Sequence, residues 1–174
     1  ADLTGTTLAN VVISATTNLT SAILVGADLG GDDLTGVDLE KADLRGADLA
    51  SIDLENAILT GANLSKNGTT ATDLTNATLT GAKLSKADLS GANLAGSALT
   101  NADLTGVNFT GANLTSINVH GANLTGADLT GATLTGIFID GATTNLTKAI
   151  LVGADLGGDD LTGVDLEKAD LRGA

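Results

Sequence analysis

A five-residue repeat runs through the whole chain and constrains its fold more than any other feature. We call the central apolar position of each pentad i, as at Leu3, Leu24 and Leu44. From Leu3 to Leu171 there are 34 pentads, of which 29 carry Leu at i. Position i−2 is small, i−1 is Asp or Asn in 23 of 34 pentads, i+1 is Thr or Ser in 20 of 34, and i+2 is usually Gly. Thr69 is the one polar residue at i.

A period of five matches neither the 3.6-residue period of an α-helix nor the 2-residue period of a strand. A helix or a flat strand would therefore scatter the leucines over all of its faces. A chain that turns once every five residues instead directs positions i and i−2 inward and the other three toward water. Gly at i+2 and Asp or Asn at i−1 suit the tight corners that such a path needs. The repeat predicts a β-solenoid whose coils pair with one another along the axis.

The pentads Ala42-Asp43-Leu44-Arg45-Gly46 and Ala122-Asn123-Leu124-Thr125-Gly126 closely resemble the A-(D/N)-L-x-x consensus of the pentapeptide-repeat family. The resemblance covers essentially the whole chain. It implies an all-β fold, a right-handed quadrilateral β-helix with four pentads per coil. Residues 1–174 would then form a single solenoid of eight to nine coils.

Composition excludes several classes of function. The chain has no Cys and a single His, His120, which leaves no thiolate or His-cluster metal site and no Ser/His or Cys/His relay. No motif for a cofactor, a phosphate or a nucleophile–base pair is present, so we expect a non-enzymatic protein without cofactors. A net charge of −13 argues against direct binding of nucleic acid, and no apolar run is long enough for membrane insertion.

A second, longer repeat is superimposed on the pentads. Residues 16–47 recur at 143–174 with one difference, Ser21 against Lys148, at an offset of 127 residues. We interpret the chain as a window on a tandem array of ~127-residue units; a partial duplication and an engineered fusion are the alternatives. The unit holds 25 pentads plus two residues, which is not a multiple of four pentads. Successive units should therefore be rotated by about one face, unless the junction before Leu19 and Leu146 compensates.

The acidic residues are unevenly distributed. Residues 1–55 carry a net charge of −8, residues 56–127 a net charge of zero and residues 128–174 a net charge of −5. The simplest interpretation is a solvated surface that keeps the rod from aggregating. The family resemblance implies an alternative, because some members imitate DNA and inhibit or protect a type II topoisomerase (gyrase).

Two further features could carry a site. Asp32 and Asp159 stand at the inward i−2 position, next to Asp33 and Asp160, which makes the four residues weak candidates for a Ca²⁺ site. Capping of nearby backbone N–H groups is the favoured interpretation. The segment Lys66-Asn67-Gly68-Thr69-Thr70 breaks the pattern and predicts a bulged or loose corner.

The favoured function is that of a structural protein, a segment of a filament, sheath or surface fibre that stacks axially on copies of itself. Outward-facing apolar residues are the candidates for self-association: Val12, Ile23, Ile58, Phe138 and Ile150. Exposed Asn and Thr could also carry glycans, because eight N-x-S/T sequons occur. An extracellular or cell-surface location fits this function, and a cytoplasmic location is the alternative.

Overall fold

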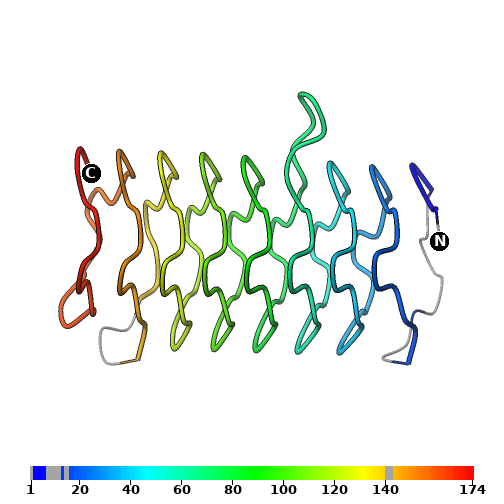
Figure 1. Ribbon diagram of the computed structural model, residues 1–174, viewed down its shortest axis with the longest axis horizontal. Coiled ribbons are helices and arrows are strands. Elements are labelled where there is room, and N and C mark those ends of the chain that lie inside the picture. The colour runs from blue at the N-terminus through cyan, green and yellow to red at the C-terminus, as the bar shows by residue number, and fades with distance from the viewer. Residues whose placement is uncertain (1, 7–12, 14–15, 140–142) are drawn as a thin grey trace.

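The computed structural model describes residues 2–6, 13, 16–139 and 143–174. Over these residues the chain winds into a rod of stacked coils (Figure 1). Isolated parallel bridges join each coil to the next, most of them between residues 20 positions apart, as in Asp43↔Asn63. A spacing of 20 residues is four pentads per coil. The described residues contain no helix and no strand longer than a single bridge position.

The bridges sort the coiled pentads into four faces, which we name A to D in chain order. Each bridge is made by position i−1, so a face is a column of these residues along the rod. The columns, as far as bridges define them, are face A with residues 2, 23, 43, 63, 88, 108, 128, 150 and 170; face B with 28, 48, 73, 93, 113, 133 and 155; face C with 33, 53, 78, 98, 118 and 138; and face D with 18, 38, 58, 83, 103, 123, 145 and 165.

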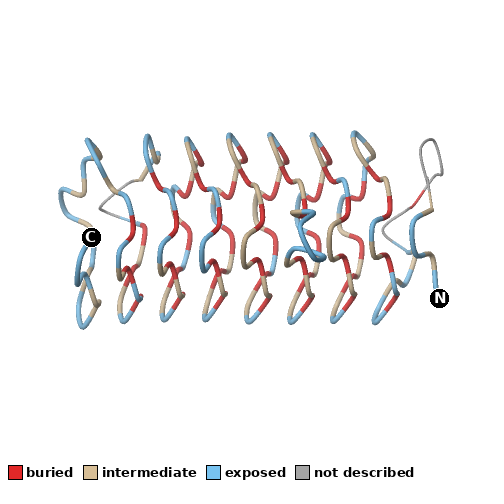
Figure 2. Cartoon of the chain, turned by 90° about the horizontal axis from the view of Figure 1, so that it is seen from above, coloured by how far each residue is buried: buried red, intermediate tan, exposed pale blue. Residues whose placement is uncertain are grey.

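Positions i and i−2 form the core, as the repeat predicts. Leucines at i and alanines at i−2 are almost completely buried from Ala22 to Ala154 (Figure 2). Phe109 occupies an i position in mid-rod with no exposed surface. Each buried Leu contributes about 1.5–3 kcal/mol relative to an exposed one, so a column of them can hold the rod together with almost no aromatic residues.

The corners depend on a left-handed backbone at position i+2. Nearly every described i+2 residue has a positive φ, and it is usually Gly, as at Gly46 with φ +64°. Where the side chain is larger, as at Lys41 and Asn101, the φ is +57° and +58°. The expectation that Asp and Asn at i−1 would also supply unusual dihedrals is wrong. These residues lie in the extended bridge, and they act through their side chains.

The segment Lys66–Thr70 is an ordered hairpin rather than a bulged or loose corner. Asn67 and Thr70 form an antiparallel bridge, with the Asn67 N–H 2.7 Å from the Thr70 oxygen and the Thr70 N–H 3.0 Å from the Asn67 oxygen. Thr69 lies exposed in the hairpin, so no coil has a polar residue at its core position there. The hairpin projects from the side of the rod, and the coils continue in register on both sides of it (Figure 1).

The hairpin also explains why an offset of 127 residues leaves the two copies of residues 16–47 on the same faces of the rod. Six successive bridges on face D lead from Asn18 to Asn145, so Leu19 and Leu146 lie on the same face. Four of the six steps are 20 residues long, the step across the hairpin is 25 and the last step is 22. The odd pentad of the unit is extruded, and the remaining pentads make six whole coils. The compensation therefore occurs mainly at Lys66–Thr70, and the two copies of residues 16–47 have the same orientation about the axis.

Candidate interaction surfaces

The outward side chains form a repeated hydrogen-bonded turn. The Oδ1 atom of Asp or Asn at i−1 accepts the backbone N–H of residue i+1, at 2.9 Å from Asp73 to Thr75 and 3.0 Å from Asn108 to Thr110. A Thr at i+1 donates its hydroxyl to the same oxygen, at 2.6 Å between Thr105 and Asp103. The frequent Asp/Asn-Leu-Thr sequence is explained by this Asx turn, which supplies an acceptor for an N–H that the coil leaves free.

Some of these side chains also bond between coils. The Asn108 Nδ2 donates to Asp88 Oδ1 at 3.1 Å, and the Asn113 Nδ2 donates to Asn93 Oδ1 at 2.9 Å. Position i−1 thus serves the turn and the stacking of coils together. Side chains used in this way are part of the scaffold.

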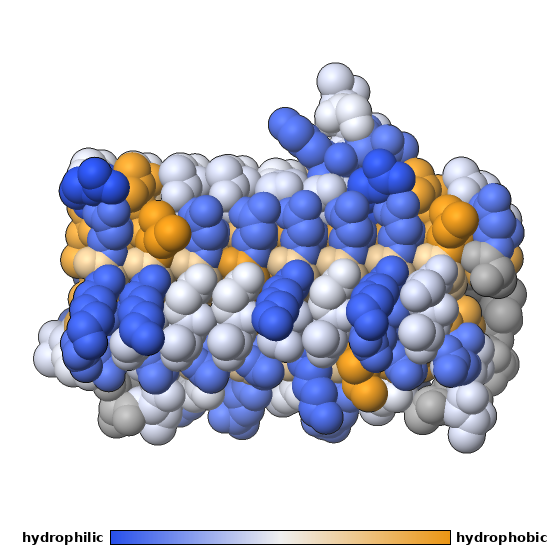
Figure 3. Space-filling view, viewed as in Figure 1, coloured by the Kyte–Doolittle hydropathy of each residue, from blue (hydrophilic) through white to orange (hydrophobic). Residues whose placement is uncertain are grey.

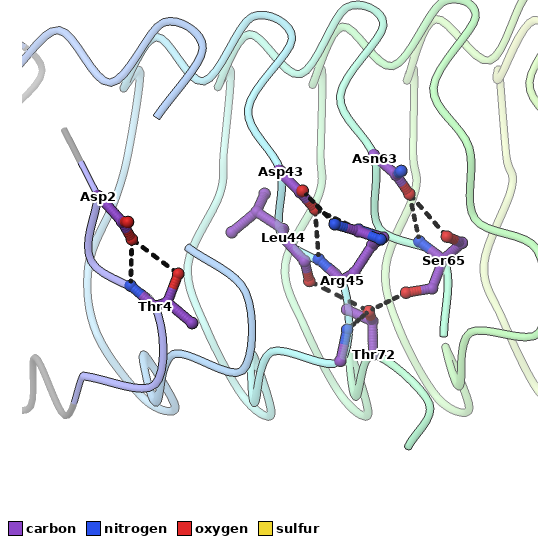
Figure 4. A network of polar contacts seen from close by, with 9 residues as sticks. Asp2, Thr4, Asp43, Leu44, Arg45, Asn63, Ser65 and Thr72 are labelled. Atoms are coloured by element: carbon purple, nitrogen blue, oxygen red, sulfur yellow. Dashed lines mark hydrogen bonds and ion pairs between the residues drawn. The ribbon is translucent and has the colours of Figure 1, made fainter. Parts of the chain in front are cut away.

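A buried threonine forms hydrogen bonds to the backbone at the point where the hairpin interrupts the coil. Thr72, the first i−2 residue after the hairpin, is fully buried, and its Oγ1 accepts the Gly46 N–H at 2.8 Å (Figure 4). The carbonyl oxygens of Leu44 and Ser65 lie 3.2 and 3.0 Å from the same Oγ1. Thr144, at the corresponding inward position after Thr143, is also buried, and its Oγ1 lies 3.0 Å from the Val119 oxygen. Sequence reasoning missed both residues, although Thr in place of Ala at i−2 was a usable signal.

We expect Thr72→Val to lower the free energy of unfolding by about 0.5–1.5 kcal/mol, because valine keeps the volume but removes the buried hydroxyl, and the Gly46 N–H is left with its longer contact to the Ser65 oxygen, at 3.2 Å. Thr110→Val is the matched control, since Thr110 is exposed at i+1 and its loss costs an exposed hydrogen bond alone. Urea unfolding followed by circular dichroism measures both. Equal losses in the two variants would contradict the role given to Thr72.

The four candidate calcium residues do not form a cluster. Among the described residues, no group of three or more His, Cys, Asp or Glu side chains is placed to hold a metal. Asp159 Oδ1 accepts the Gly136 N–H at 2.9 Å, which is a backbone-capping contact. Asp33 and Asp160 accept the N–H groups of the residues two positions later, at 3.0 and 2.9 Å. Asp32 Oδ2 and Asp159 Oδ2 are buried without a hydrogen-bond partner in the described part of the chain.

Several carboxylates are stabilised in their charged form. The Arg45 guanidinium, with Nε and Nη2 each 2.7 Å from the Asp43 carboxylate, lowers the pKa of Asp43. The Thr35 hydroxyl lowers the pKa of Asp33, and Thr162 does the same for Asp160. A carboxylate whose pKa is lower in the folded state stabilises the fold above its unfolded pKa, and this contribution is lost as the pH falls through the folded pKa.

We therefore expect the Asp43–Arg45 pair to contribute its full stability at neutral pH and to lose it progressively below about pH 4. Asp43→Asn should lower the melting temperature at pH 7 by more than it does at pH 2.5. Thermal melts of the two proteins across this range measure the difference. A wild-type advantage that persists unchanged at pH 2.5 would contradict the assignment.

The structure separates the self-association candidates. Ile23 and Ile150 lie on face A with 41% and 38% of their surface exposed, and Phe138 lies on face C with 63% exposed. Ile58 lies on face D and is half-buried. Val12 falls outside the described residues. The five candidates thus form no single patch, but Ile23 and Ile150 share one face.

Charge differs among the faces. Face C carries Asp53 beside Glu55, and face D carries Asp38 beside Glu40 and, in the second copy, Asp165 beside Glu167. Face A has no acidic residue at i+1, and its Arg45 and Arg172 each pair with the aspartate of their own pentad. In the coils that contain Ile23 and Ile150, the acidic residues therefore lie on the faces other than A. None of the described residues forms a helix that could cross a bilayer.

Comparison with known proteins supports the fold. A solved structure of HetL, a pentapeptide repeat protein involved in heterocyst differentiation regulation from the cyanobacterium Nostoc sp. strain PCC 7120, matches with a TM-score of 0.56 and 29% identity, over 99% of this chain and 84% of that chain. A structure of QnrB1, a plasmid-mediated fluoroquinolone resistance protein, matches with a TM-score of 0.55 and 22% identity, over 97% and 83%. No curated protein matches the sequence significantly.

These structural neighbours imply the right-handed quadrilateral β-helix that the resemblance led us to expect. The family model for pentapeptide repeats matches eight copies, over residues 15–49, 38–66, 72–111, 108–143 and 144–174. The matches leave out the centre of the hairpin, where the chain departs from the coil. The chain belongs to the pentapeptide-repeat family.

Proposed function

We propose that the chain is a non-enzymatic structural protein, a segment of a filament, sheath or surface fibre that grows by axial stacking of coils. The observation that carries the proposal is the phase of the longer repeat. Six whole coils separate the two copies of residues 16–47, so repeated units keep one orientation about the axis. At the spacing of paired strands the unit advances about 29 Å.

A comparison of identical residues supports stacking. Leu44 and Leu171 belong to the same pentad sequence, Ala-Asp-Leu-Arg-Gly, in the two copies. Leu44 is fully buried because the next coil covers it, with the Leu44 N–H 2.7 Å from the Asn63 oxygen. Leu171 is 41% exposed, and the coil that contains it borders an open recess of about 440 Å³. The surface around Leu171 therefore has the same sequence as the surface around Leu44, which the next coil covers.

Electron microscopy of the purified chain at rising concentration tests the proposal, and we expect rods of one-coil width that lengthen with concentration. Leu171→Lys should shorten them, because a charge then lies in the stacking surface. Thr35→Lys adds the same charge at an exposed lateral position and is the control that should leave the rods unchanged. Particles of single-chain length at every concentration would overturn the proposal.

The competing function, an acidic imitation of duplex DNA that acts on a type II topoisomerase, has weaker support. A DNA mimic needs a continuous negative surface. Residues 56–127 have no net charge, and in mid-rod Lys83 lies on face D and Lys86 at the corner that follows it. We expect no effect of the protein in a gyrase supercoiling assay at micromolar concentration, and inhibition or protection there would favour the competing function.

A further inference from the structure

We propose that face A is a lateral docking surface for a second copy of this chain, with the two rods parallel and related by a two-fold axis along their length. This surface is distinct from the stacking surface at Leu171, and the proposal does not depend on axial growth. It rests on the side chains of face A at positions i−1 and i+1, which differ in kind from those of the other faces.

Face A carries the same apolar doublet twice. Ile23 and Val25 stand at i−1 and i+1 of one coil, and Ile150 and Val152 stand at the same positions six coils later. Both isoleucines are among the exposed large apolar residues of the described chain. Figure 3 shows a row of polar side chains interrupted near each end by an apolar patch. Elsewhere on this face i−1 is Asp or Asn, so each isoleucine replaces an Asx turn with exposed apolar surface, beside a half-buried valine.

A two-fold axis parallel to the rod reverses the strand direction across the contact. Position i−1 of one copy then faces position i+1 of the same coil in the other copy. Ile23 meets Val25 of the second copy, Asp43 meets its Arg45, and Asp88 meets its Ser90. The complete set of facing pairs along face A is 2 with 4, 23 with 25, 43 with 45, 63 with 65, 88 with 90, 108 with 110, 128 with 130, 150 with 152, and 170 with 172.

Every one of these pairs is complementary. Apolar residues face apolar residues, carboxylates face guanidinium or hydroxyl groups, and amides face hydroxyl groups. The same operation on face D places Asp38 against Glu40, and on face C it places Asp53 against Glu55, which are like-charge contacts. Complementarity of this kind selects a partner and its orientation. An antiparallel pair is disfavoured on face A, because it lays one column of aspartates on the other.

The expected strength follows from the area. Nine coils at the spacing of paired strands give a contact about 38 Å long, and three residues give a width of about 10 Å, so that about 800 Å² is buried in total. Stable complexes bury about 1,200–2,000 Å². We therefore expect a weak, reversible dimer, and rods of several units would pair more strongly because the same face recurs along each of them.

Analytical ultracentrifugation from about 10 μM to about 1 mM tests the pairing in a Leu171→Lys background, where the added charge opposes axial stacking. We expect the mass of this parent protein to rise toward that of a dimer and the same protein with Ile23→Asn/Ile150→Asn to stay monomeric. Asn at i−1 restores the Asx turn found at Asn63, so this variant should unfold no earlier than the wild type. Ile58→Asn makes the same change on face D and should leave dimerisation intact. A monomeric Leu171→Lys protein, or a dimer of it that survives the double substitution, would overturn the proposal.

Disulfide trapping distinguishes the orientations, because the chain has no cysteine of its own. A mixture of Ile23→Cys and Val25→Cys chains, one of them carrying a mass tag, should give the mixed disulfide on mild oxidation. A mixture of Ile23→Cys and Ile150→Cys chains should not, and preferential trapping in this mixture would refute the parallel arrangement. Axial stacking does not bring positions 23 and 25 of different copies together, so failure here leaves the proposed function standing.

Discussion

Leu44→Ala should lower the free energy of unfolding by about 2–5 kcal/mol, whereas Leu171→Ala should lower it by less than about 1 kcal/mol. The two leucines lie in identical pentads, so local sequence and turn geometry cancel in the comparison. Leu44 has no exposed surface, and its removal leaves a cavity that the stacked coils on either side cannot fill. Leu171 is 41% exposed and loses fewer contacts.

Urea unfolding followed by far-ultraviolet circular dichroism measures both variants, because the chain has no Trp or Tyr for fluorescence. The comparison is made at low protein concentration, where neither axial nor lateral contacts cover Leu171. Similar losses for the two variants would mean that Leu171 is covered in solution. That result would contradict the burial seen in the single chain and would itself indicate self-association.

Phe109→Ala should cost about 3–5 kcal/mol, and Phe138→Ala should cost almost nothing. These are the two phenylalanines of the chain. Phe109 stands at position i on face A and is fully buried, while Phe138 stands at i−1 on face C with 63% of its surface exposed. Because the two side chains are the same, the difference between the two losses of unfolding free energy measures the effect of an inward against an outward position in the pentad.

The same urea titrations measure this pair. A large loss of unfolding free energy for Phe138→Ala would show that the outward Phe138 packs against another surface. Face C, and not face A, would then be the favoured surface for self-association. A small loss for Phe109→Ala would show that neighbouring leucines close around the vacated volume. Phe109→Leu separates that case, because leucine is the usual residue at this position and should be tolerated at a cost of under about 1.5 kcal/mol.

Much of the fold could be predicted because its unit is local. One pentad already specifies which side chains point inward, as Leu44 and Ala42 illustrate, and where the backbone must turn, as Gly46 illustrates. The repeat correctly predicts that Asp and Asn at i−1 face outward, but it does not predict their role in the turn. The hydrogen bond from Asp73 Oδ1 to the Thr75 N–H depends on an extended backbone at Asp73, and the repeat alone does not distinguish that from a corner.

The candidate surfaces were less accessible to sequence reasoning. Ile23, Ile58 and Ile150 have equivalent positions within their pentads, yet Ile58 lies on a different face from the other two. Assigning a face requires counting pentads through the whole chain. Any pentad that leaves the coil shifts every later residue by a quarter turn. The inward Thr72 lies directly after the pentad that leaves the coil. Its contacts with Leu44 and Ser65 form only in the folded chain, so the sequence does not reveal them.

The sequence by itself determined the five-residue coil and its aliphatic core, because these follow from a periodic pattern that any stretch of a few pentads displays. It also determined the 127-residue offset, because residues 16–47 and 143–174 match when they are compared directly. The tertiary structure alone decided which pentads stack on one another. The hairpin at Lys66–Thr70 is five residues long, the same as the repeat, so its insertion leaves the sequence period undisturbed while it restores the two copies to one orientation. A pentad within a coil and the pentad that forms the hairpin have the same length. They differ in the burial of the central side chain, which is buried in the coil, as at Leu64, and exposed in the hairpin, as at Thr69.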